Sequence, residues 1–157
     1  MGIAPPSAWT KLLGVVSANS VSTASDGSIY IAGFTNNNHD GQTNSGIQDA
    51  FITKFNSDGS KVWTKLLGGK SFDYANSVST ASDGSIYIAG HTLSRNIDGQ
   101  TNSGSQDAFI TKFNSDGSKV WTKLLGVVNS ASTYSVSTAS DGSVYIAGYT
   151  NKGTSKN

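Results

Sequence analysis

Hydrophobic and polar residues alternate along short stretches of this chain, and no stretch has the spacing of an amphipathic helix. The segment 28–35 (SIYIAGFT) and the segment 49–55 (DAFITKF) are rich in β-branched and aromatic residues, which is typical of strands. The pattern predicts four strands in the first sequence repeat, at 19–25, 28–35, 49–56 and 60–67.

The tetrapeptide Ser-Asp-Gly-Ser separates the first two strands at 25–28 and the last two at 57–60. Asp-Gly between alternating segments is typical of a type I′ turn, which requires positive φ at both central residues. The sequence therefore predicts two tight hairpins in each repeat, with Asp26–Gly27 and Asp58–Gly59 as their turns.

The whole pattern recurs with a period of about 58 residues. The stretch 48–68 reappears unchanged at 106–126, and 18–33 reappears unchanged at 75–90, with a third, slightly altered copy at 133–148. Self-similarity at this period indicates a propeller or a solenoid. Four short antiparallel strands joined by paired hairpins favour an all-β propeller built from four-stranded blades.

The succession "DGSIYIAGFT", "DAFITKFNSDGSK", "W" and "LLG" resembles the SBBP β-propeller repeat family, and the likeness extends over 8–150. The resemblance implies a propeller fold and a bacterial secreted or cell-envelope setting. It implies no catalytic residue and no defined ligand. The closing Gly-Gly pair of the family is kept only at 68–69, whereas 14–15 and 126–127 read Gly-Val.

The predicted strands do not make up whole blades. A fourth strand at 8–14 precedes blades at 19–67 and 76–125, a partial blade follows at 133–150, and 151–157 forms a tail, giving about 2.7 blades. An open stack would expose two apolar faces, so we expect a homo-oligomer that closes head to tail, in which the last hairpin of one copy joins the strand 8–14 of the next. Two or three copies would give six or nine blades. The alternative is a fragment or engineered piece of a longer propeller.

Composition narrows the function classes only slightly. The 157 residues carry a net charge of +1 and only 13% are charged, so no general attraction to nucleic acid or to an anionic membrane is expected. The absence of cysteine rules out disulfides and thiolate chemistry. No phosphate-binding glycine motif is present. Two histidines without cysteine argue against zinc, and we expect no enzyme activity, no cofactor and no metal.

Ligand binding is predicted on the end of the blades that carries the long connections 36–48, 69–75, 93–106 and 127–133, because function concentrates in loops on rigid scaffolds. Amides, carboxylates and aromatic rings there suit a glycan or a protein surface. The candidates are Asn38, His39, Asp40, Gln42, Phe72, Asp73, Tyr74, Arg95, Asn96, Asp98, Gln100 and Tyr134. The alternative is that these residues only form turns, and this alternative is preferred over a cation site at Asp40 and Asp98. His91 aligns with Phe34 of the preceding repeat.

Overall fold

The computed structural model describes residues 8–126 and 129–151, and within these ranges every regular element is a strand. The strands are β1 (Val16–Thr23), β2 (Ile29–Thr35), β3 (Asp49–Phe55), β4 (Lys61–Leu67), β5 (Asp73–Thr80), β6 (Ile86–Thr92), β7 (Asn96–Ile97), β8 (Gln100–Thr101), β9 (Asp107–Phe113), β10 (Lys119–Leu125), β11 (Ser130–Thr138) and β12 (Val144–Asn151).

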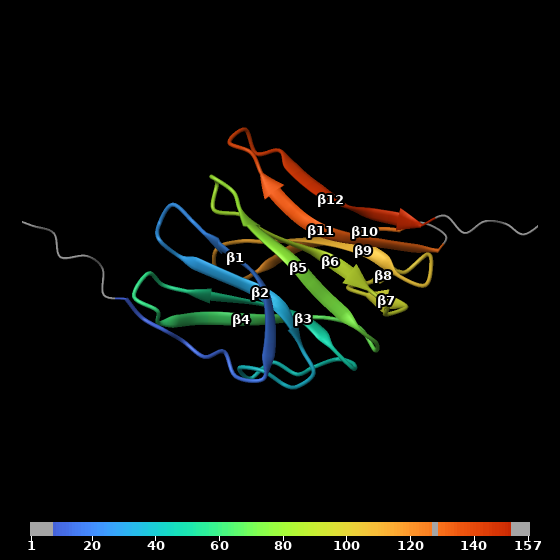
Figure 1. Cartoon of the computed structure of the whole chain (residues 1–157), viewed down its shortest axis with the longest axis horizontal. Coiled ribbons are helices and arrows are strands. Elements are labelled where there is room, and N and C mark those ends of the chain that lie inside the picture. The colour runs from blue at the N-terminus through green and yellow to red at the C-terminus, as the bar shows by residue number, and fades with distance from the viewer. Residues whose placement is uncertain (1–7, 127–128, 152–157) are drawn as a thin grey trace, which may run out of the picture.

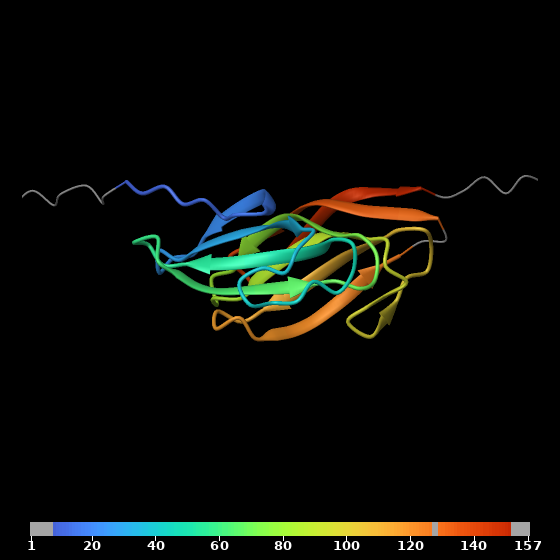
Figure 2. The same ribbon diagram turned by 90° about the horizontal axis from the view of Figure 1, so that it is seen from below.

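The strands form two complete blades and half of a third (Figure 1). The first blade has the order β1-β2-β3-β4 and the second the order β5-β6-β9-β10, all antiparallel, while β11 and β12 form a hairpin. Figure 2 shows the sheets layered against one another. The predicted four-stranded blades are confirmed, although β1 starts at Val16 rather than at residue 19, and Asn151 belongs to β12 rather than to a tail.

The hairpin turns gather at one end of the blades and the long connections at the other, as predicted (Figure 1). The predicted turn type was wrong. Gly27 has φ of 82°, whereas Asp26 is not in the positive-φ region, and the Gly27 amide donates to the Ala24 carbonyl. The Ser28 amide donates to Asp26 Oδ1 at 2.8 Å. This side-chain bond fixes Asp26 in an ordinary turn conformation, and only the glycine takes the left-handed one.

The residues 8–14 form no strand, which corrects the predicted strand at this position. Without a paired third strand beside it the segment has no ladder to join. Its tryptophan nevertheless contacts the first blade, because Trp9 Nε1 donates to the Ser57 carbonyl at 3.0 Å. The same bond recurs one blade later, from Trp63 Nε1 to the Ser115 carbonyl at 3.2 Å.

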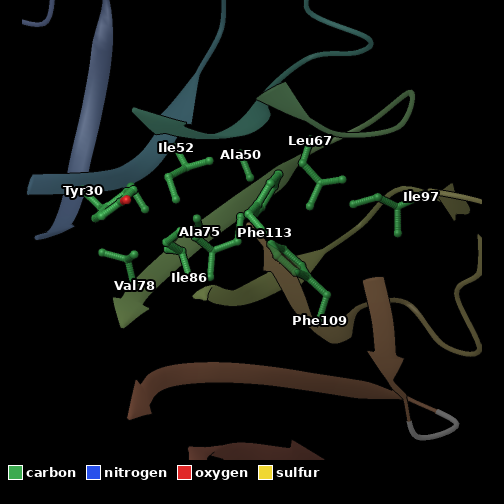
Figure 3. Close-up of a cluster of buried hydrophobic side chains, with 12 residues drawn as sticks. Tyr30, Ala50, Ile52, Leu67, Ala75, Val78, Ile86, Ile97, Phe109 and Phe113 are labelled. Atoms are coloured by element: carbon green, nitrogen blue, oxygen red, sulfur yellow. The ribbon is translucent and has the colours of Figure 1, made fainter. Parts of the chain in front are cut away.

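The main core lies between the first and second blades (Figure 3). Side chains from β2 and β3, such as Tyr30 and Ile52, meet side chains from β5, β6 and β9, such as Val78, Ile86 and Phe109. All of these are almost fully buried. Burial of large apolar side chains is the dominant stabilising contribution, so each blade depends on the next for stability.

The first strands of successive blades are joined by a polar contact that occurs twice. The Val78 amide of β5 donates to Ser20 Oγ of β1 at 3.1 Å, and the Val136 amide of β11 donates to Ser77 Oγ of β5 at the same distance. Identical residues thus make an identical contact, which is the pattern expected of stacked repeats.

A β-bulge in each first strand adds a second repeated contact. The bulged residue Asn19 donates from Nδ2 to the Ala75 carbonyl at 2.9 Å, and Asn76 donates to the Thr133 carbonyl at 2.8 Å. The bulge in β11 places Tyr134 at the corresponding position. Bulges re-aim side chains, and here they direct an amide at the next blade.

Candidate binding surface at the loop end of the blades

The two longest connections are held against the outer strands of their own blades. Asp40 in the β2–β3 connection pairs with Lys61 of β4, and Asp98 in the β6–β9 connection pairs with Lys119 of β10. Asp40 and Asp98 have φ of 49° and 50°, and each is followed by a positive-φ glycine. The type I′ geometry expected at the Ser-Asp-Gly-Ser turns therefore occurs in these long connections instead.

The hydrogen bonds of Asp40 hold the β2–β3 connection against β4. Burial raises the pKa of Asp40, but hydrogen bonds from Lys61 and Thr64 outweigh this effect and hold the pKa below its usual value. The Thr64 hydroxyl donates to Asp40 Oδ2 at 2.5 Å, and His39 Nε2 lies 3.3 Å from the same oxygen. A lysine ammonium thus occupies the place beside this carboxylate, which supports the turn-forming interpretation of the loop.

Asp73 is buried and its oxygens are occupied by the chain itself. It accepts hydrogen bonds from the Gly69 amide at 2.8 Å, the Thr92 hydroxyl at 2.5 Å and the Ser94 hydroxyl at 2.8 Å. Burial raises the pKa of Asp73, while these three hydrogen bonds lower it, and the net direction is upward. This carboxylate therefore anchors the β4–β5 and β6–β9 connections to each other.

An aromatic row crosses the boundary between the first and second blades. The rings of Phe72 and Tyr74 are stacked at 6.3 Å with an interplanar angle of 4°. Tyr74 lies between Phe34 of β2, at 4.8 Å edge to face, and His91 of β6, at 4.8 Å stacked. Phe72 and Tyr74 are two of the predicted candidates, whereas Phe34 and His91 were not among them. We call these four side chains the aromatic row.

His91 of β6 lies at one end of the aromatic row. Burial lowers the pKa of His91, and its Nδ1 lies 3.2 Å from both Asn76 Nδ2 and Ser132 Oγ. The four side chains of the aromatic row are partly exposed. Aromatic rings beside amide and hydroxyl groups can stack against the C–H face of a sugar or hold an apolar side chain of a peptide.

The other candidates lie apart from the aromatic row. Asn38 lines an open hollow of about 550 Å³ with Asn36, Asn37, Asn44 and Gly46. The backbones of His39 and Gln42 pair with each other, Asn96 and Gln100 belong to the small β7–β8 hairpin, and Arg95 is exposed beside it. Tyr134 lies on the half blade, 5.6 Å from the ring of Tyr149. The structure therefore does not gather the twelve candidates into a single site.

Among residues 8–126 and 129–151, no three His, Cys, Asp or Glu side chains are placed to bind a metal ion together. The described part of the chain also contains no helix of the length and apolarity needed to cross a bilayer.

Comparison with known proteins supports the class indicated by the blades. The chain is a β-propeller repeat protein: residues 24–61 and 81–119 match a β-propeller domain of unknown function, DUF5122. Residues 62–98 match the SBBP β-propeller repeat, so the chain contains an SBBP repeat, and the predicted resemblance to this family is confirmed. It is also 31% identical over 124 residues to the regulatory protein FlaEY of Caulobacter vibrioides. That match covers 68% of this chain and 13% of the length of FlaEY.

Proposed function

We propose that this chain is a non-catalytic β-propeller scaffold that closes into a ring by head-to-tail association of two or three copies. The observation that carries the proposal is the contact between first strands. The chain makes this contact twice internally. The valine side of the same contact is left without a neighbouring blade on β1, and the serine side on β11.

The two free halves are complementary residue by residue. Val21 of β1 is the counterpart of Val78, and Ser135 of β11 is the counterpart of Ser20. Val21 is 63% exposed, whereas Val78 is 5% exposed. In a ring, the Val21 amide of one copy would donate to Ser135 Oγ of the neighbouring copy and bury the valine side chain.

The mass of the particle in solution tests this proposal. Light scattering after gel filtration should give two or three times the chain mass of 16.3 kDa. The substitution Val21→Asp should reduce the mass to one chain, because a charge would be buried in the contact. The matched control is Val120→Asp, at a residue that is 47% exposed on the outer strand β10 and belongs to neither free end. A single-chain mass for the unmodified protein at about 100 µM would overturn the proposal.

The free end on β11 differs from the internal contact at one residue, and this yields a second test. Tyr134 occupies the position at which Asn19 and Asn76 donate to the next blade. Restoring the amide by Tyr134→Asn is expected to tighten association by about fivefold, because a net hydrogen bond contributes about 1 kcal/mol. A dilution series followed by mass photometry measures the change. Unchanged or weaker association would mean that β11 and β1 do not meet in this way.

The second candidate function is recognition of a glycan or a protein on the loop end, and the aromatic row supports it. The relative FlaEY is named a regulatory protein, which is compatible with a binding role. Phe72→Ala would remove one ring of the aromatic row, so any ligand found on a glycan array or in a peptide screen should lose affinity. Val62→Ala, at a residue that is 48% exposed on the outer strand β4 beside the hairpin turn, is the control. If no ligand is found, the alternative of a purely structural propeller segment gains support.

A further inference from the structure

We propose that the free edge of β12 and the cavity beside it bind one further β-strand. The occupant is a strand and turn with the sequence of residues 106–118 of this chain, which is the third strand of the repeat with its turn. This inference goes beyond the proposed ring, because it concerns the position of the third strand in the half blade, which the first-strand contacts do not fill.

Two positions of the repeat are buried at the boundary between the first and second blades and exposed at the boundary with the half blade. Ile88 of β6 is 0% exposed, while its counterpart Ile146 of β12 is 41% exposed. Leu67 of β4 is 6% exposed, while its counterpart Leu125 of β10 is 39% exposed. For Ile146, the exposure follows from strand pairing. β6 is paired on both edges, by β5 and β9, whereas within the described chain β12 is paired only by β11.

A cavity of about 260 Å³ lies where a third strand would place a side chain. Its apolar lining comes from β9, β10, β11 and β12, and includes Ala108, Leu125, Ala131 and Ile146. One blade earlier, the counterparts of three of these residues, Ala50, Leu67 and Ile88, share a core with the buried Phe109 of β9 (Figure 3). The cavity therefore corresponds to the place of a phenylalanine from the missing strand.

The strand register of the second blade specifies how the occupant would lie. Phe109 is opposite Gly90 and Phe113 is opposite Ile86. Transferred by one repeat, the two phenylalanines of the occupant would lie opposite Gly148 and Val144 of β12. Strand addition of this kind gains affinity from backbone hydrogen bonds and specificity from pockets for alternate side chains.

Trp121 of β10 gives an independent indication of the same occupant. Trp9 and Trp63 each donate from the indole to the carbonyl of a serine in the turn after the third strand of the following blade. Trp121 keeps the equivalent ring contact, with Tyr87 at 6.1 Å, but among the described residues its indole has no hydrogen-bond acceptor. The turn in residues 114–118 of the occupant would supply this acceptor.

Fluorescence anisotropy of a labelled peptide with the sequence 106–118 tests the inference on the full chain. Saturable binding with one peptide per chain is expected, whether the chain is single or assembled. A control peptide with Phe109→Ser should bind about 10- to 100-fold more weakly, because a buried phenylalanine is lost. Since the peptide carries the change, folding of the protein is not affected.

Hydrogen exchange on the same samples locates the peptide. Protection is expected in Val144–Asn151 and not in Val16–Thr23. Absence of saturable binding at about 200 µM peptide, equal affinity for the control peptide, or protection confined to β1 would each overturn the inference. Light scattering of the same samples reports ring assembly separately, so failure of the ring and failure of this site are distinguishable.

Discussion

Replacing Ile88 and Ile146 by alanine, one at a time, gives a controlled test of the half-built third blade. The two residues occupy the same position of the repeat, within IYIAG and VYIAG. Ile88 is fully buried in the main core, so Ile88→Ala should cost about 2–5 kcal/mol from lost burial and the new cavity. Ile146 is 41% exposed beside a cavity that already exists, so about half of the transfer energy is at stake and the cost should be about 1 kcal/mol.

Urea unfolding at low protein concentration, where association is minimal, measures both changes in the free energy of unfolding. The midpoint should fall clearly further for Ile88→Ala than for Ile146→Ala, with similar slopes. Equal losses would refute the reasoning, because they would mean that β12 is as well covered as β6. The comparison is internal to one chain, so differences in intrinsic residue propensity largely cancel.

Two further predictions concern turns and buried acids. Gly117→Ala should lower the unfolding midpoint more than Gly84→Ala. Both glycines have positive φ, so alanine costs about 1–2 kcal/mol at either position. Only at Gly117 would the new Cβ also lie 2.9 Å from the Trp63 ring. Equal midpoints would contradict this contact. The pKa of Asp73 is higher folded than its usual value, so this residue makes the folded chain more stable as pH falls through the folded pKa, and less stable as pH rises through it. Asp73→Asn should remove that component, as urea titrations between pH 3 and pH 7 would show, and an unchanged pH profile would contradict it.

The fold was predictable because the repeat supplies the same local signals several times. Alternating segments located every strand of the two blades within about three residues, but the sequence did not reveal the β7–β8 hairpin. Its signal was present, since Asp98–Gly99 is the same dipeptide that was used to place the other turns. The dipeptide alone did not distinguish the two geometries. The backbone amide of Ser28 donates to Asp26 Oδ1 and holds Asp26 in an ordinary turn, whereas Asp98 pairs with Lys119 of β10.

The site was less predictable because it is formed between blades. Phe72 and Tyr74 were identified from their loop position, but their partners Phe34 and His91 lie at the ends of β2 and β6. The alignment of His91 with Phe34 was the available signal, because it shows that one ring in each repeat approaches the same end. Sequence spacing gives no information on which of two neighbouring blades contributes the ring that stacks on Tyr74.

The repeated first-strand contact has a consequence for how the molecule finds its own structure. Because Ser20 and Ser77 receive the same amide at the same distance, this contact does not distinguish one blade from another. As far as this contact is concerned, the order of the blades is set by covalent connection. A chain emerging from the ribosome can pair its second blade correctly with its first, or equally well with that of another nascent chain. Exchange of blades between chains is thus the characteristic misfolding hazard of this sequence, and it grows with every identical copy added.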